Sequence, residues 1–573
     1  MFRNIIPLLS AAAAAIVLAS SCSDRKLPGN GNWIFEGASG QVSIPRIDSM
    51  PDIPSTYMMI DWAAKARAYD AYVFDWNRVV KPKDLIWLDT SRKNVDFDVF
   101  GLRTTVDDCR QGPGINTSSH EAINTMAAVL SGGLMGIDKT AQDGHNYARM
   151  LQGYYSKDWG IMLNGTSGYA TDWWYNVLPN LLYYGVCDIF PKVAGAEAIQ
   201  RSIADRFASA DEILGKNYSH SYFHYGWMAP VDGSIPFQED AAGGHAYVLL
   251  NAYRKFGDVK YLDRAVNAID VLDSQKESRF YEILLPFGIY CAAYLNAAEG
   301  KDYDIARMMK WVFNGCTSSS GRNGWGVITG KWGDYDVSGL QGSITDGGGY
   351  AFLMNSFEMA WPLVPMVKYQ PQWARAIGRW MLNNASASRL FYPGYIDRTH
   401  QYARDHIGYT DNNIAYEGLR KTDRYNVYGV SPIAEGDGPS WISGNGTTTM
   451  FSLYSTSPVG IFGSIISLTD VEGVIRLDCN ATDFYAERKY PVYLYYNPYD
   501  HEVRIKLEDV RYRRYDLFDI TTRTYLDKGY EGTAEIILQP HSARVLYVLP
   551  GGTCLEQNED GRIVDQDGFT VAY

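Results

Sequence analysis

The stretch GGHAYVLLNAYRKFGDVKYLDRAVNAIDVLDSQ, residues 243–275, decides the fold because it contains two helices of different character. Its first half, which ends at Gly257, is largely apolar around its circumference, and a helix of this kind is usually buried. Its second half places apolar residues on one side and charges on the other, so we expect one face to be exposed. The stretch therefore predicts a helical hairpin with an inner and an outer helix.

The same pairing recurs along the chain. Further inner–outer pairs are predicted at 118–134 with 142–156, 171–190 with 196–214, 280–300 with 302–314, and 345–367 with 370–386. A sixth pair joins an early outer helix at 57–74 to a late inner segment at 440–456, whose glycines and threonines are poor helix formers. The long linkers lead from an outer helix into an inner one, so in a closed ring they share one end. We predict a mainly α fold, an (α/α)6 toroid at residues 51–460 with its functional face at that end.

The residues after the ring have a different pattern. Residues 461–553 alternate with a period of two and contain the turn NPYD, which predicts a small antiparallel β-sandwich domain. Residues 554–573 are interpreted as a solvated acidic tail. Their acids depart from the spacing of a calcium-binding EF-hand loop, so we predict no metal site, and the sequence indicates no cofactor.

The first 22 residues resemble a bacterial lipoprotein signal. A cation at Arg3 precedes an apolar run that ends in small residues and Cys22. The resemblance implies that Cys22 is lipidated and that the exported protein is anchored to a membrane surface. An ordinary secretory signal is the alternative. Residues 23–50 are interpreted as a linker, and no later segment has the ~20 uninterrupted apolar residues of a membrane span.

The composition excludes some partners and favours others. The net charge is −13 without a Lys/Arg-rich run, which argues against nucleic acid as a partner. The 43 tyrosines and 15 tryptophans suit a core, but the same side chains also line sugar-binding clefts. No C-x-x-C pair supports a zinc or redox motif, and Cys187 and Cys291 are predicted to be buried free thiols. The sequence does not indicate the oligomeric state.

The chain resembles the six-hairpin (α/α)6-toroid glycosidases and the related polysaccharide lyases. The resemblance is carried by TDWWYNVLPNLLYYGVCDIFP, residues 171–191, and AYRKFGDVKYLDRAVNAID, residues 252–270, and it covers roughly residues 55–460. It implies a carbohydrate substrate and an active site at the starts of the inner helices. The C-terminal domain resembles the β modules attached to many glycoside hydrolases.

Acidic residues stand at the predicted starts of several inner helices. Each one alone is explained as a helix cap, which satisfies free backbone N–H groups. Their convergence in one funnel favours a catalytic role, because cleaving a glycosidic bond needs two carboxyl groups of different pKa. We expect Glu239 or Asp240 to face an acid from another loop. The candidate catalytic residues are Glu239, Asp240, Asp346, Asp172 and Glu435, and Glu121 and Glu282 also stand at helix starts.

Aromatic and polar residues near the same helix starts are candidates for binding substrate. His245 lies one turn inside its helix and is equally well explained as a hydrogen-bonded core histidine. Gly243 and Gly244 allow close approach of a neighbouring helix or of substrate. The candidate substrate-binding residues are Asp108, Trp173, Trp174, His245, Tyr281, Trp325, Trp332 and Asp437.

The sequence thus predicts a glycoside hydrolase that uses paired carboxylates. One alternative is a polysaccharide lyase, in which a Tyr or His base abstracts a proton beside a uronate carboxyl group. A second alternative is a glycan-binding lipoprotein without catalysis, which would keep the aromatic residues but would not need opposed acids.

Overall fold

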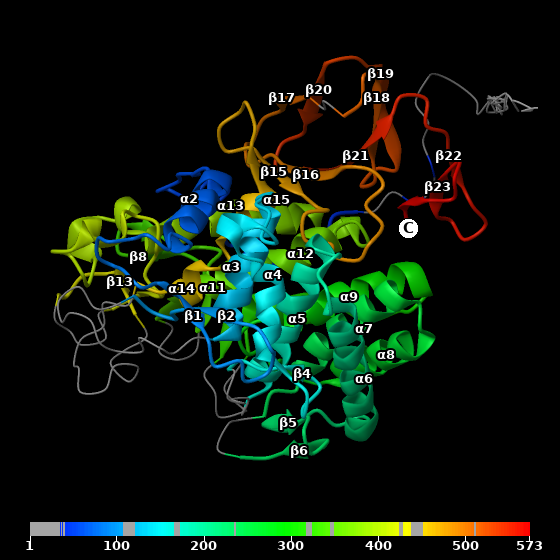
Figure 1. Ribbon diagram of the computed structural model, residues 1–573. Helices are drawn as coiled ribbons and strands as arrows, with labels where there is room; N and C mark the ends of the chain where they lie inside the picture. The colour runs from blue at the N-terminus through cyan, green and yellow to red at the C-terminus, as the bar shows by residue number, and fades with distance from the viewer. Residues whose placement is uncertain are drawn as a thin grey trace, which may run out of the picture.

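The computed structural model shows a ring of helices with a β domain at one end (Figure 1). Helices and antiparallel sheets both form large parts of it, so the predicted helical toroid and β domain are present, but "mainly α" fits only in part. Within the described ranges, no helix combines the length and apolar character needed to cross a membrane. The structure describes Phe35, Gly37 and residues 40–106, 121–165, 172–233, 237–316, 324–343, 349–422, 428–436, 451–508 and 511–573.

Six helical walls form the inner ring. Each wall packs against the next, and α15 packs against α3 to close the ring. Burial extends over most of their length, for example from Ala122 to Gly132 in α3, as expected for helices that are apolar all round. In chain order the walls are α3 (Ala122–Leu134), α5 (Trp173–Ile189), α7 (Ala241–Phe256), α9 (Leu284–Glu299), α11 (Leu353–Glu358) with α12 (Ala360–Met366), and α15 (Val459–Ile465).

Outer helices pack on the outside of this ring. Helix α8 buries Tyr261, Ala265 and Leu272 against α7 and α9 and leaves Lys260 and Asp263 exposed. The hairpin predicted at 243–275 is therefore confirmed by α7 and α8. The outer helices in the described part are α2 (Trp62–Val73), α6 (Ala196–Leu214), α8 (Val259–Ser274), α10 (Ile305–Asn314) and α13 (Ala374–Ser388).

Two predicted helices differ from the structure. The outer helix predicted at 142–156 is wrong as a single helix, because Asp143 and Gly144 have positive φ angles of 53° and 81° and interrupt it. The late inner segment lies mostly outside the described residues, and the sixth wall is formed by α15, which follows the short helix α14. The elements found are η1 (Gln142–Gly144), α4 (Tyr147–Met150), η2 (Leu151–Tyr154), β3 (Tyr155–Ser156) and α14 (Leu453–Thr456).

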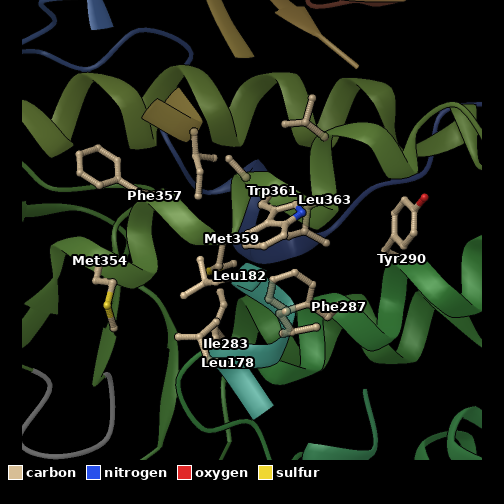
Figure 2. Close-up of a cluster of buried hydrophobic side chains, with 14 of the residues drawn as sticks. Leu178, Leu182, Ile283, Phe287, Tyr290, Met354, Phe357, Met359, Trp361 and Leu363 are labelled. Atoms are coloured by element: carbon tan, nitrogen blue, oxygen red, sulfur yellow. The ribbon is translucent and has the colours of Figure 1, made fainter. Parts of the chain in front are cut away.

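Apolar side chains from α5, α9, α11 and α12 form a buried cluster, as Figure 2 shows. Trp361 packs edge-to-face on Phe287, with ring centroids 5.1 Å apart. Its indole N–H donates to Tyr247 Oη at 2.9 Å, so its polar atom is satisfied in the core. Cys187 and Cys291 are buried free thiols, as predicted.

The glycines at the start of α7 permit close helix packing. A Cβ atom at Gly243 would lie 2.6 Å from the carbonyl oxygen of Leu284 and 2.9 Å from the nitrogen of Gly288. The neighbour that approaches Gly243 is therefore the backbone of α9, one of the two possibilities that the sequence left open.

We expect Gly243→Ala to lower the free energy of unfolding by about 1–3 kcal/mol, because the added methyl group must push two packed backbones apart. Urea denaturation measures the loss. Gly408→Ala is the control, since a Cβ atom there meets nothing within 4 Å. Equal losses in the two variants would contradict the packing argument.

The β domain is a sandwich of unequal sheets. A six-stranded antiparallel sheet in the order β14-β15-β16-β21-β18-β19 packs one face on α13 of the ring. A two-stranded sheet of β17 and β20 covers the other face, and Ile505, Leu517 and Ile536 belong to the core between them. The strands are β14 (Ile466–Leu468), β15 (Ile475–Asp478), β16 (Val492–Tyr496), β17 (Val503–Glu508), β18 (Tyr515–Asp519), β19 (Thr524–Tyr530), β20 (Thr533–Leu538) and β21 (Ala543–Pro550).

The C-terminal segment is folded, which corrects its interpretation as a solvated tail. It forms a three-stranded sheet of β22 (Leu555–Gln557), β23 (Ile563–Asp565) and β24 (Thr570–Ala572). Ile563 is fully buried in the main core, and Asp565 accepts hydrogen bonds from Lys489 and Tyr490, each at 2.6 Å. The acidic composition of residues 554–573 gave no indication of these contacts.

A five-stranded sheet in the order β13-β12-β11-β10-β7 joins the loops that enter the fifth and sixth walls. Its strands are β7 (Trp325–Val327), β10 (Gln341–Ser343), β11 (Tyr350–Phe352), β12 (Gly418–Arg420) and β13 (Ile433–Glu435). The remaining short elements are α1 (Pro45–Asp48), β1 (Ile86–Asp89), β2 (Val99–Leu102), β4 (Ile161–Met162), β5 (Tyr222–His224), β6 (Ala229–Val231), β8 (Lys331–Trp332), β9 (Tyr335–Asp336), η3 (Pro371–Trp373), η4 (Arg389–Phe391), η5 (Pro393–Tyr395), η6 (Arg398–His400) and η7 (Ile407–Thr410).

Candidate active site

The N-terminal ends of the inner helices are linked to one another at one end of the ring. The indole N–H of Trp174, at the start of α5, donates to Tyr454 Oη in α14 at 3.0 Å. The backbone N–H of Tyr281, just before α9, donates to Asp240 at the start of α7 at 3.1 Å. These contacts bring side chains that are far apart in the sequence into one site.

Asp172 is the N-cap of α5. Its carboxylate accepts a hydrogen bond from the backbone N–H of Trp174 at 2.9 Å. The side-chain amide of Gln238, in the loop before α7, donates to both of its oxygens at 3.1 and 3.2 Å. Asp172 therefore caps a helix and fastens a loop, which accounts for its carboxylate without a catalytic role.

Asp240 is almost fully buried at the start of α7, with 1% of its surface exposed. Its Oδ2 accepts the hydrogen bond from Tyr281, and its Oδ1 has no hydrogen-bond partner among the described residues. Burial raises the pKa of Asp240 well above its ordinary value, and the charges of Glu239 and Glu282 raise it further. Burial therefore favours the protonated form of Asp240, while the hydrogen bond from the Tyr281 backbone opposes the shift in its pKa.

Glu239 has different partners from its neighbour Asp240. Its Oε1 accepts a hydrogen bond from Ser219 Oγ at 3.0 Å and lies 3.6 Å from Arg279 Nε. The two adjacent acids are thus held by separate groups and do not form a pair with each other.

The charge of Glu282 acts on three neighbouring titratable groups. The sequence identified this residue only by its position at a helix start. Its backbone has a positive φ of 58°, which is uncommon outside glycine and is found at strained functional positions. Its carbonyl oxygen accepts a hydrogen bond from the side chain of Gln341 at 2.8 Å. Its charge raises the pKa of Asp240, Glu358 and Tyr454.

Glu358 lies at the end of α11 and was not singled out from the sequence. It is fully buried, and neither carboxyl oxygen has a hydrogen-bond partner among the described residues. Burial raises its pKa well above the ordinary value, and Glu282 adds to the effect. An acid in the middle of the apolar run 345–367 was the available signal for this residue.

Glu121 is a further acid at this end of the ring, and it is partly buried. It occupies the N-cap position of α3 and accepts a hydrogen bond from Asn164 Nδ2 at 2.8 Å. Burial raises its pKa, and the bond from Asn164 opposes the shift.

A chain of aromatic rings runs past these acids. Tyr281 meets Trp325 edge-to-face at a centroid distance of 5.5 Å, and Trp325 meets Phe352 at 6.2 Å. Phe352 stacks with Tyr454 at 6.4 Å, and Tyr454 accepts the bond from Trp174. The structure therefore brings three of the predicted binding residues, Trp174, Tyr281 and Trp325, into one aromatic wall.

Glu435 is connected to the aromatic wall by contacts of Arg420. It is fully buried in β13 and lies 3.0 Å from Arg420 Nε in the paired strand β12. The Arg420 guanidinium lies over the ring of Tyr350, at 4.3 Å, and Tyr350 stacks on Phe352. Arg420 balances the Glu435 charge, so this carboxylate stabilises the sheet beside the site.

Comparison with known proteins finds remote likenesses among solved structures. No family model and no curated protein matches the sequence. A solved structure described as a glycoside hydrolase aligns over 77% of this chain and 76% of its own, with 12% identity and a TM-score of 0.35.

Two further solved structures align in the same way. A GH127 β-L-arabinofuranosidase from Geobacillus stearothermophilus T6 shows 10% identity over 78% of this chain and 74% of its own, with a TM-score of 0.31. A GH127 β-arabinofuranosidase shows 10% identity over the same shares, with a TM-score of 0.35. These likenesses are remote in both sequence and structure.

Two predicted binding residues belong to the core. Trp173 and His245 are fully buried, and their rings lie 5.5 Å apart. The Trp173 indole donates to the carbonyl oxygen of His220 at 2.8 Å, and the His245 nitrogens lie 3.2 and 2.8 Å from the hydroxyls of Tyr218 and Tyr225. Protein groups therefore surround both rings, which fits the core histidine that the sequence left open for His245, and substrate contact by Trp173 or His245 stays a prediction.

Trp332 also lies outside the aromatic wall, since it is buried in the β8–β9 hairpin. Four predicted residues fall outside the described residues: Cys22, Asp108, Asp346 and Asp437. Among the described residues, no three His, Cys, Asp or Glu side chains are grouped as metal ligands would be.

His245 makes stability depend on pH. Burial lowers its pKa from 6.5 to about 3, so it stays neutral in the folded protein while the unfolded chain takes up a proton below pH 6.5. Its stabilising contribution is present above that pH and is lost as the pH falls toward 3. We expect His245→Phe to cost about 1–3 kcal/mol at pH 8 and less at pH 5, measured by urea denaturation. An equal cost at both pH values would contradict this assignment.

Proposed function

We propose that this chain is a glycoside hydrolase, with Asp240 as the proton donor and Glu282 as the second carboxylate. The observation that carries the proposal is that burial and the charges of two neighbouring acids, Glu239 and Glu282, favour the protonated form of Asp240. Asp240 accepts a hydrogen bond from Tyr281, the residue that precedes Glu282, and the Glu282 charge helps to keep Asp240 protonated. Glycoside cleavage requires such a division between a protonated acid and a charged carboxylate.

In this mechanism Asp240 gives its proton to the glycosidic oxygen as the bond to the anomeric carbon breaks. Its buried Oδ1, which has no hydrogen-bond partner among the described residues, carries the proton in this proposal. Glu282 then either attacks the anomeric carbon or activates the water that attacks it. The aromatic wall of Tyr281, Trp325 and Tyr454 would bind the apolar faces of the sugar rings.

Tyr454 and His245 are poor candidates for the base of a lyase, which favours hydrolysis over proton abstraction. A lyase base must lose its own proton readily. Burial raises the pKa of Tyr454 well above the ordinary value, and the charges of Tyr175, Glu121 and Glu282 raise it further. His245 is enclosed in the core.

An activity screen tests the proposal. The chain without residues 1–22 is incubated with neutral and uronate-containing glycans, and reducing ends are measured together with the ultraviolet absorbance of unsaturated uronates. New reducing ends without that absorbance are expected. The absorbance would replace the hydrolase with the lyase, and glycan binding without cleavage would indicate a binding protein.

We also propose that the protein is exported and anchored through a lipid on Cys22, on the basis of its N-terminal sequence. Mass spectrometry of the protein extracted from membranes should find an acylated N-terminal peptide beginning at Cys22. A mature N-terminus at another residue would identify an ordinary secretory signal.

A further inference from the structure

An exposed tryptophan stands on the hairpin that precedes α7. Strands β5 and β6 pair antiparallel, with His224 opposite Ala229, and Trp227 lies in the turn between them. The Trp227 side chain is 74% exposed, although a large apolar ring is normally covered. Figure 1 shows this hairpin at the end of the molecule opposite the β domain.

The Trp227 indole is held in a fixed orientation by a stack of three rings. Trp159 lies 4.0 Å from His224, and His224 stacks on Trp227 at 3.8 Å with only 6° between the planes. The backbone N–H of Trp227 also donates to His224 Nδ1 at 3.0 Å. One face of the indole is therefore covered by the histidine, and its high exposure leaves the other face open to solvent.

Both ends of the hairpin are attached to the candidate active site. At its start, the His220 carbonyl oxygen accepts hydrogen bonds from the Trp173 indole at 2.8 Å and from the Gln238 backbone at 3.3 Å. Ser219 donates to Glu239, and the Gln238 side chain donates to Asp172. The base of the hairpin thus contacts the helix starts that carry the candidate acids.

We propose that Trp227 is a sugar-binding subsite that holds a distal residue of a glycan chain whose other part occupies the active site. The rigid, open indole face matches the apolar C–H face of a sugar ring. At the base of the hairpin, His220 Nδ1 lies 2.9 Å from the exposed side chain of Asp232. The choice of a glycan as ligand rests on the proposed function.

A purely structural role does not account for Trp227. An indole that is 74% exposed buries little apolar surface, so it adds little to folding stability. Its order is instead what a binding surface requires, because a ring already fixed in place loses little entropy when a ligand binds. Trp227→Ala is accordingly expected to fold and melt like the wild type.

The experiment compares wild type with Trp227→Ala, Trp227→Phe and Leu468→Ala. Leu468 is the control, because it is an apolar residue 56% exposed on β14 in the β domain. Retardation in gels containing soluble xylan, arabinan, mannan or mixed-linkage glucan measures binding. Rates on the oligosaccharides of any glycan that is cleaved, and on the matching aryl monosaccharide, measure length dependence.

Trp227→Ala is expected to weaken glycan binding and kcat/KM on long oligosaccharides about five- to tenfold, with rates on the aryl monosaccharide unchanged. Trp227→Phe should retain much of the binding, and Leu468→Ala all of it. Cleavage with equal rates in wild type and Trp227→Ala on long and short substrates would overturn the subsite and leave the hydrolase intact.

The other outcomes separate the two proposals. Retardation of wild type but not of Trp227→Ala, without cleavage of any glycan, would support the subsite and overturn the hydrolase. Neither retardation nor cleavage of wild type on the whole panel would overturn both.

Discussion

Asp240→Asn should lower kcat on a cleaved glycan by about 10²- to 10⁴-fold, because an amide cannot give a proton to the leaving oxygen. Its shape and its hydrogen bond from Tyr281 are retained, so KM should change little. The same variant should alter the pH profile. Burial and the neighbouring acids raise the pKa of Asp240, so wild-type activity is present while Asp240 is protonated and is lost as pH rises through that pKa.

Two comparisons separate this chemistry from damage to the fold. Asp304→Asn changes another carboxylate at a helix start, one that caps the outer helix α10 by accepting from the Arg307 backbone at 2.9 Å, and it should leave kcat unchanged. A dinitrophenyl glycoside, whose leaving group needs no proton, should be cleaved by Asp240→Asn at close to the wild-type rate. An equal loss on both kinds of substrate would remove Asp240 from the role of proton donor.

Asp483→Asn should lower the free energy of unfolding by about 3–5 kcal/mol, because it leaves buried cations without their counter-charge. Asp483 is fully buried in the segment between β15 and β16. It lies 2.5 Å from Lys368 Nζ and 3.6 Å from Arg254, and it accepts hydrogen bonds from Tyr290 and Tyr369. These partners belong to α7, α9 and the residues after α12, so one carboxylate fastens the β domain to three parts of the ring.

This network also predicts loss of stability in acid. Burial alone would raise the pKa of Asp483, but Lys368 and Arg254 lower it below the ordinary value of 3.8. Its stabilising contribution is therefore complete above the pKa of the unfolded chain and is lost as pH falls through the lower folded pKa. Urea denaturation at pH 7 and in acid measures the effect, with Asp500→Asn, an exposed carboxylate, as the control. A cost for Asp483→Asn no larger than for Asp500→Asn would contradict the counter-charge role.

The sequence predicted the ring because the distribution of apolar and charged residues around a helix indicates whether that helix is buried. An apolar circumference marks an inner helix and a charged face marks an outer one, as in α7 and α8. The residues of the candidate active site were harder to predict from the sequence. Helix starts identified Asp240, but the importance of Glu282 depends on a positive φ angle and on acids brought to it by tertiary contacts. Glu358 was overlooked because it lies in an apolar run, where core packing is the simpler explanation.

The ring can close only after the last inner helix has been synthesised. Ser131 in α3 donates to the carbonyl oxygen of Ser457 at 2.5 Å and accepts from the backbone of Gly460 at 3.0 Å, across more than 320 residues of chain. The first inner helix must therefore keep an apolar side uncovered until the last one has been synthesised. A chain that is released before residue 459 lacks this final wall, so an early stop would expose a strip of α3 to aggregation and proteolysis.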